Sequence, residues 1–162
     1  MTKQNERYNW ARLNHLQVGK YGEYYSKMRM VEMGWQLYTS EVDDRGIDYL
    51  IRTNLGKCVE AQVKTVRLKK NAYVFFRKDH ISPEQLKKSY AICLVVMREG
   101  EEPDIFFIPG RVWLAPNDIF VSHDYEGRKS APEYGIAISQ KNLLKLSEYI
   151  LRPESLDLFT LK

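Results

Sequence analysis

Two apolar segments joined by a short polar turn constrain the fold of this chain more than any other feature of its sequence. Residues 46–51 and 59–65 are each apolar enough to form a strand, and residues 53–56 between them read Thr-Asn-Leu-Gly. Asn and Gly tolerate the positive φ that such loops require. The pattern therefore predicts two adjacent strands connected by a hairpin loop.

Polar side chains alternate with apolar ones along both segments. Successive side chains of a strand point to opposite faces of the sheet, so Glu60, Gln62 and Lys64 share one face. In the first segment Asp48 lies opposite its apolar neighbours. Charges inside a sheet are costly to desolvate and usually persist when they are paired or bind a metal. The pattern indicates a polar cluster around Asp48, and its alternative is an ordinary solvated sheet face.

The composition is that of a single globular domain. The chain has 162 residues, of which 44% are hydrophobic and 12% aromatic. No apolar run is long enough for a membrane span, and the first residues lack the apolar stretch of a signal peptide, so we expect a cytoplasmic protein. Cys58 and Cys93 lack metal-site spacing, which favours two reduced core thiols over a zinc site.

Basic residues gather in and after the second segment. Arg67, Lys69 and Lys70 follow it closely, whereas the turn at residues 99–104 is acidic. The net charge of +4 is compatible with nucleic acid as a partner. The basic cluster predicts contacts with phosphates, and its alternative is a solubilising edge of the sheet.

A helix is predicted over residues 14–33, with Asn14 as its N-cap and Gly34 as its C-terminal stop. Glycine is costly inside a helix, so Gly19 and Gly22 predict that the helix backbone lies close to the sheet. Glu23 would then lie beside that contact, and its alternative is an exposed helix glutamate.

Turn and capping residues divide the rest of the chain into further elements. We expect strands at 35–39, 72–76, 90–97, 104–108 and 134–138, helices starting at Ser82 and Ser139, a short helical segment at 109–114, loops at 40–45 and 122–133, and a tail from 152. The 122–133 loop is expected to be mobile and near substrate. Asp43 and Asp44 in the first loop are further candidates to assist a metal.

The order Gly46-Ile47-Asp48 and then Gln62-Val63-Lys64-Thr65 resembles the Asp…(Asp/Glu/Gln)-x-Lys signature of the restriction-endonuclease-like, or PD-(D/E)XK, nuclease superfamily, in its Gln-x-Lys branch. The segment Gly19-Lys20-Tyr21-Gly22-Glu23 resembles the Gly-x-x-Gly/Ala-Glu pattern of its first helix. The resemblance covers roughly residues 13–108. It implies an α/β (α+β) fold with an αβββαβ core, a mixed central sheet flanked by helices, and a C-terminal strand-helix addition at 109–162 within one domain.

The resemblance further implies a metal-dependent endonuclease that hydrolyses phosphodiester bonds in nucleic acid, with DNA preferred. Asp48, Gln62, Lys64 and Glu23 would be catalytic. Mg²⁺, or Mn²⁺ in its place, would be held by Asp48, Gln62, the carbonyl of Val63 and Glu23 through water. Lys64 would orient or deprotonate the attacking water and stabilise the charge of the transition state.

Nucleic acid would be contacted by basic side chains of the first helix and of the turn after the second strand, namely Lys20, Arg67, Lys69 and Lys70. A homodimer is left open. Gln62 departs from the usual acidic residue, so the alternative is a nuclease-fold module without activity that binds nucleic acid or a protein partner.

A second register is Glu60-x-Gln62, with Gln62 in the position of the lysine. Glu60 and Lys64 are about 13 Å apart along a strand, so they do not share one ion. We favour the Lys64 register, since it keeps a cation in the site.

Overall fold

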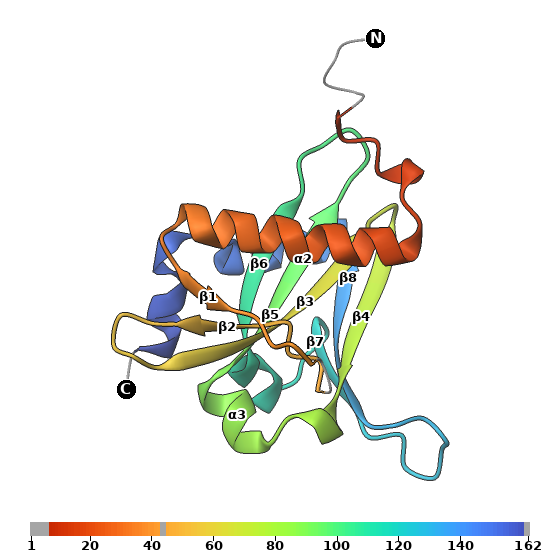
Figure 1. Cartoon of the computed structure of the whole chain (residues 1–162). Helices are drawn as coiled ribbons and strands as arrows, with labels where there is room; N and C mark the ends of the chain where they lie inside the picture. Colours follow the sequence, from red (N-terminus) through yellow and green to blue (C-terminus); the bar gives the residue numbers. More distant parts are fainter. Residues whose placement is uncertain (1–6, 43–44, 161–162) are drawn as a thin grey trace.

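A mixed five-stranded sheet in the order β1-β2-β3-β5-β6 forms the centre of the molecule (Figure 1). The structure, a computed structural model, describes residues 7–42 and 45–160, so Asp43 and Asp44 lie outside the described residues. β3 and β5 are parallel and the other neighbours are antiparallel. The strands are β1 (Gln36–Tyr38), β2 (Tyr49–Arg52), β3 (Cys58–Arg67), β5 (Tyr90–Met97) and β6 (Asp104–Pro109). The predicted hairpin and mixed sheet are confirmed.

One face of this sheet is covered by the helix α2 (His15–Glu32), which crosses it in Figure 1. The helix begins with a capping box, in which Asn14 accepts from the backbone N–H of Gln17, and the chain leaves it at Gly34 with φ 78°. A Cβ built on Gly22 would lie 1.8 Å from Oγ1 of Thr65 in β3, so the predicted close approach is confirmed there.

The same prediction is wrong for Gly19. A Cβ on Gly19 would meet nothing within 4 Å, because this part of the helix borders an open hollow lined in part by Gln17, Lys20 and Glu23.

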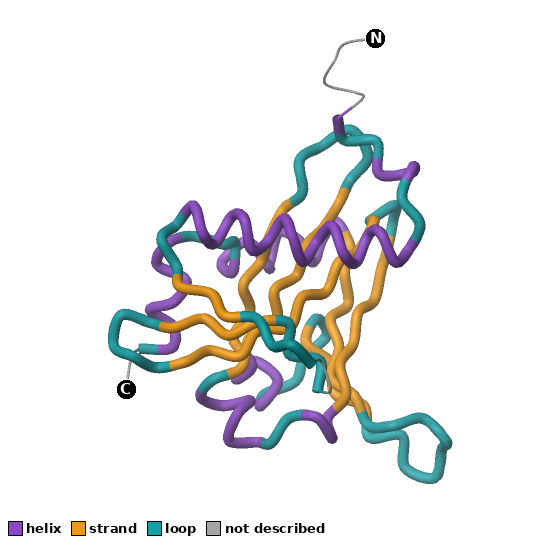
Figure 2. The backbone as a smooth tube through the Cα atoms, viewed as in Figure 1, coloured by secondary structure: helices purple, strands orange, loops and turns teal. Residues whose placement is uncertain are grey.

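A second, three-stranded antiparallel sheet covers the opposite face of β5, in the order β4-β8-β7. Its strands are β4 (Asn71–Arg77), β7 (Phe120–His123) and β8 (Glu133–Ser139). One cluster of buried side chains fills the space between the two sheets and another lies beneath α2. Every residue of β5 is buried, as expected for a central strand covered on both faces. Figure 2 shows the two sheets and the helices around them.

Shorter helical elements connect these strands. α3 (Pro83–Lys88) starts at Ser82 with the predicted capping box, and Ser139 caps α4 (Gln140–Leu146). The remaining ones are 3-10 helices, namely η1 (Trp10–Arg12), η2 (Lys78–His80), η3 (Gly110–Leu114), η4 (Ser147–Tyr149) and η5 (Pro153–Phe159). No helix of the described part is both long enough and apolar enough to cross a membrane.

Three expectations about the C-terminal third and the thiols are corrected. The loop expected from residue 122 begins later, because Ser122 and His123 pair with β8. The segment after residue 152 is not a tail, since Phe159 is buried and its ring packs edge-on against Phe107 at 5.8 Å. Cys93 is a buried thiol as expected, but Cys58 at the start of β3 is exposed.

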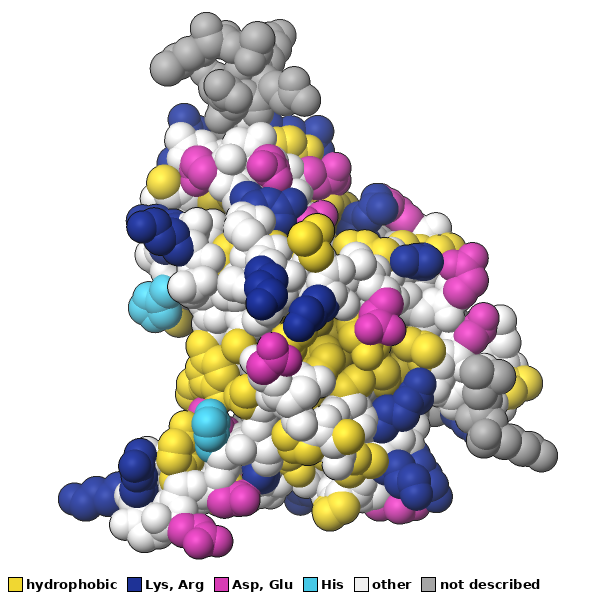
Figure 3. All heavy atoms as spheres, turned by 180° about the vertical axis from the view of Figure 1, so that it is seen from behind, with side chains coloured by type: hydrophobic (Ala, Val, Ile, Leu, Met, Phe, Trp, Pro, Cys, Tyr) yellow, Lys and Arg dark blue, Asp and Glu magenta, His cyan; other side chains and the backbone are white. Residues whose placement is uncertain are grey.

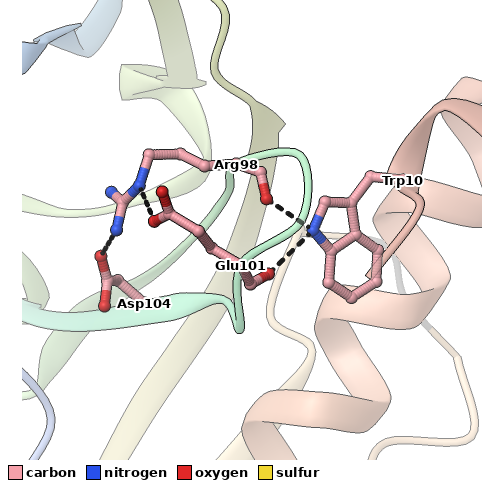
Figure 4. A network of polar contacts seen from close by, with 4 residues as sticks. All are labelled: Trp10, Arg98, Glu101 and Asp104. Carbon is pink, nitrogen blue, oxygen red and sulfur yellow. Dashed lines mark hydrogen bonds and ion pairs between the residues drawn. The ribbon is translucent and has the colours of Figure 1, made fainter. Parts of the chain in front are cut away.

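The segment before α2 is fastened to the turn between β5 and β6 (Figure 4). The indole N–H of Trp10 donates to the carbonyl oxygens of Arg98 and Glu101, at 2.9 and 3.1 Å. Arg98 in turn forms ion pairs with Glu101 and Asp104, at 2.7 and 2.6 Å. Trp10 is only 4% exposed, so this contact fixes where the chain enters α2.

Candidate active site

Asp48 lies immediately before β2, at the point where β2 and β3 stop pairing. The last ladder pair is Tyr49 with Ala61, and the N–H of Asp48 donates to the carbonyl of Ala61 at 2.9 Å. Beyond this point β3 continues beside β5 without β2 on its other side. The N–H of Val63 needs an acceptor there and donates to Oδ2 of Asp48 at 2.6 Å. The half-buried carboxylate is therefore held against the middle of β3.

Gln62 lies opposite Asp48 in this register, and two neighbours fix its side chain. The phenol of Tyr90 donates to Oε1 of Gln62 at 2.7 Å. Burial raises the pKa of Tyr90, and the negative charges of Asp48 and Glu60 raise it further, so the phenol stays a proton donor. Gly46 has φ 70°, and a Cβ there would lie 2.6 Å from Nε2 of Gln62. An amide oxygen accepts two hydrogen bonds, so Oε1 keeps a lone pair besides the one that Tyr90 uses.

Lys64 follows Gln62 on the same face of β3 and is half-buried. Its ammonium lies 5.9 Å from the centre of the Phe75 ring on β4. A cation at this distance from an aromatic face is attracted to it. Gln62 and Lys64 therefore lie on β3 on either side of Val63, the residue that Asp48 contacts.

Glu23 lies on α2, next to the contact between Gly22 and Thr65. Its carboxylate accepts from the ammonium of Lys20 at 2.6 Å, and the Glu23 side chain is 25% exposed. The hydrogen bond and charge of Glu23 raise the pKa of Lys20, and the charge of Asp48 adds to that effect. The contacts of Glu23 are thus made within α2.

Glu60 is directed away from this group. Its carboxylate accepts from the side-chain amide of Gln85 in α3 at 2.9 Å. Asp48, by contrast, contacts Val63 in the middle of β3. This arrangement supports the register that uses Gln62 and Lys64 over the one that uses Glu60.

The predicted nucleic-acid contacts separate into two kinds. Arg67 donates from one guanidinium nitrogen to the carbonyl oxygens of Trp10 and Leu13, at 3.0 and 2.7 Å, and so ties the entry of α2 to β3. Lys69 and Lys70 are exposed in the turn between β3 and β4. The face opposite to that of Figure 1 carries charges of both signs around apolar areas (Figure 3). Among the predicted contacts after β3, the two exposed lysines of the β3–β4 turn are thus the ones left for nucleic acid.

The atoms around Asp48 would suit a hard divalent cation. They are the Asp48 carboxylate, the amide oxygen of Gln62 and the main-chain carbonyl of Val63, and such cations take oxygen ligands of these kinds. Glu23 offers a further carboxylate on α2. Within residues 7–42 and 45–160, no group of three or more His, Cys, Asp or Glu residues is placed to hold a metal ion. The described residues therefore provide the neutral amide of Gln62 at the position where the signature usually has a carboxylate.

One residue of this region was not indicated by the sequence. Tyr90 positions Gln62 from β5, 28 residues away along the chain, and nothing local distinguishes it from the other apolar residues of that strand. Gly46, which the sequence places next to Asp48, leaves room for the Gln62 amide.

The element order α2-β1-β2-β3-α3-β5 is that of the αβββαβ core, with β4 inserted between β3 and α3. The fold is therefore of the expected α/β class, a mixed central sheet flanked by helices.

Neither a protein-family model nor a curated protein sequence matches the chain. The solved structures that are similar to it include the following two. One is the bacterial homing endonuclease I-Ssp6803I, at 14% identity and a TM-score of 0.46, over 84% of this chain and 94% of that chain. The other is Hjc, a Holliday junction resolvase from the archaeal hyperthermophile Archaeoglobus fulgidus, at 11% identity and a TM-score of 0.47, over 89% and 98%. Both TM-scores are below 0.5, so neither likeness carries weight for what this chain does.

Proposed function

We propose that this protein is a metal-dependent nuclease that hydrolyses phosphodiester bonds in nucleic acid, with DNA as the preferred substrate. The observation that supports this most is the hydrogen bond from the N–H of Val63 to the carboxylate of Asp48. Val63 lies between Gln62 and Lys64 on β3. A carboxylate, an amide oxygen and a cation are thereby gathered at one position where the edge of β3 is not paired with β2.

Each residue has a role that its contacts support. Asp48 would carry the main negative charge toward a divalent cation, while Gln62, oriented by Tyr90, would add a neutral oxygen. Glu23 would act from α2, and the carbonyl of Val63 would complete the set. When bound, the cation supplies Lewis-acid polarisation of the phosphate. Lys64 would hold the attacking water and offset the charge that develops on the phosphate oxygens.

Two substitutions test the assignment with little change of shape. Asp48→Asn keeps an oxygen that accepts from Val63 but removes the charge, and Lys64→Ala removes the cation. Each is expected to lower the cleavage rate roughly 100-fold or more. The assay follows plasmid, single-stranded DNA, branched DNA and RNA substrates with Mg²⁺, with Mn²⁺ and with EDTA.

Asp118→Asn and Lys145→Ala are matched controls. These residues form an exposed ion pair of 3.7 Å, and we give them no part in the site. Both controls should cleave at the wild-type rate. Wild-type cleavage by Asp48→Asn or Lys64→Ala would refute the proposed mechanism, and so would equal activity in EDTA.

A second function, binding of nucleic acid without cleavage, is favoured by one observation. Gln62 contributes no charge, Glu23 is paired with Lys20, and no group of three or more His, Cys, Asp or Glu within the described residues is placed to hold a metal ion. A thermal-shift titration separates the two functions. Stabilisation by Mn²⁺ that is lost in Asp48→Asn supports the nuclease, whereas salt-dependent binding with no response to metal supports the binding module.

A further inference from the structure

Two aromatic side chains are exposed side by side on the outer face of β4. Tyr73 and Phe75 are 43% and 50% exposed. Their ring centroids are 6.4 Å apart and their planes are inclined by 20°. The side chains between and beside them on the strand, Ala72, Val74 and Phe76, belong to the core between the sheets. The two rings are therefore nearly parallel and form an apolar surface that the fold leaves about half exposed.

Tyr73 is held in a fixed orientation. Its ring lies over Gly135 of β8, where a Cβ would come within 2.1–2.5 Å of the ring and hydroxyl atoms. Its phenol donates to Oε1 of Glu133 at 2.9 Å, and Tyr125 donates to the same oxygen at 2.9 Å. Burial raises the pKa of Tyr73, and the hydrogen bond and charge of Glu133 raise it further, so the donor stays protonated. A pre-organised ring loses little rotational freedom when a ligand stacks on it.

The two rings are next to the candidate active site and to a basic turn. Lys64, on the neighbouring part of β3, lies 5.9 Å from the centre of the Phe75 ring. Lys69 and Lys70 are exposed in the turn that leads into β4. β4 follows β3 directly along the chain and belongs to the second sheet (Figure 1). Apolar surface and positive charge therefore adjoin each other, which suits a ligand with aromatic groups on an anionic backbone.

We propose that Tyr73 and Phe75 form a stacking platform for unpaired bases of single-stranded nucleic acid. The spacing favours a strand over a duplex. The centroid separation of 6.4 Å is about twice the roughly 3.4 Å rise per nucleotide of one strand of a duplex. Two neighbouring bases reach both rings when the strand is extended out of the helical stack. Lys69 and Lys70 would contact its phosphates. The platform would define the substrate class of the proposed nuclease. It rests on the proposed function for the position of the scissile phosphate, which would lie beside Lys64.

Binding measured in EDTA tests the platform separately from cleavage. The full-length protein is titrated into fluorescently labelled oligothymidylate, oligouridylate and a DNA duplex of equal length. Phe75→Ala is expected to weaken single-strand binding roughly 5- to 150-fold, which corresponds to about 1–3 kcal/mol for one stacked base. Tyr73→Leu, which keeps apolar bulk but removes the ring, is expected to act in the same direction. The two oligonucleotides show whether DNA or RNA is preferred.

A tryptophan at the platform gives a direct signal. The chain has three tryptophans, and all are buried, at 4%, 9% and 2% exposure. Phe75→Trp therefore adds an exposed indole, and it should retain binding and show emission quenched by the oligonucleotide. Tyr38→Ala on β1 is the matched control, because Tyr38 is 51% exposed and should leave binding unchanged.

The outcomes are distinct. Unchanged single-strand affinity in a folded Phe75→Ala overturns the platform, as does an equal loss of duplex and single-strand binding. Wild-type protein that binds no single strand also overturns it, and the aromatic surface is then assigned to a protein partner. Absence of cleavage in Mg²⁺ or Mn²⁺ refutes the proposed nuclease but not the platform, since stacking requires no metal.

Discussion

Replacing Gly22 by alanine tests whether the contact between α2 and β3 positions the site. A Cβ at Gly22 would lie 1.8 Å from Oγ1 of Thr65, 2.8 Å from its Cβ and 2.9 Å from its Cγ2. Rotation of the Thr65 side chain moves Oγ1 and Cγ2 but not Cβ. The helix must therefore move away from the strand by about 0.6 Å if the added Cβ and the Cβ of Thr65 are to reach the 3.4 Å of an ordinary contact.

The magnitude follows from two opposing effects. Overpacking of this kind costs roughly 1–3 kcal/mol, whereas exchanging glycine for alanine inside a helix gains about 1 kcal/mol. Gly19 offers a control in the same helix, since a Cβ there meets nothing within 4 Å. Gly19→Ala should stabilise the protein by roughly 0.5–1 kcal/mol. The difference between the two variants then isolates the contact with Thr65.

Urea unfolding followed by circular dichroism measures both variants. Gly22→Ala should be less stable than Gly19→Ala by roughly 1–3 kcal/mol, or about 2–12 °C in Tm for a chain of this size. Thr65→Ala removes two of the three clashing atoms and should recover part of the loss in a double-mutant cycle. Equal stabilisation by both alanines would show that α2 does not touch β3 at Gly22.

Two further predictions concern the metal site and the basic turn. In a calorimetric titration, Gln62→Glu should strengthen Mn²⁺ binding by adding a carboxylate, and Glu60→Gln should change it little; the reverse order would favour the other register. Replacing Lys69 and Lys70 together by alanine should lower the slope of log K against log salt for DNA by roughly two, as measured by fluorescence anisotropy. Arg67→Ala should instead destabilise the fold by roughly 1–3 kcal/mol, because its guanidinium holds two main-chain carbonyls; an unchanged Tm would contradict that role.

The elements that the sequence predicted well are those with local causes. The hairpin follows from its turn, where Gly56 adopts φ 75°, and α2 follows from the capping box at Asn14. The face shared by Gln62 and Lys64 follows from the alternation of side chains along a strand. Even the position of Asp48 beside them is local, since a hairpin pairs residues that are close in sequence.

What the sequence could not predict depends on distant partners. Residues 71–77 read as a strand, but nothing near them indicates that they pair with β8 instead of the central sheet. Arg67 looks like part of a basic run, and only the main-chain carbonyls of Trp10 and Leu13 show that its guanidinium is used within the fold. Phe159 appeared to lie in a tail because its contact, Phe107, is far from it along the chain.

The pairing of β4 with β8 has a consequence during protein synthesis. Glu133, which anchors Tyr73, lies 60 positions later in the chain. At translation rates of 5–20 residues per second, β4 leaves the ribosome roughly 3–12 s before its anchor. Through that interval the strand that carries Tyr73 and Phe75 has an unpaired edge, which is a template for association with other chains. The growing chain therefore exposes this strand until β8 arrives to pair with it.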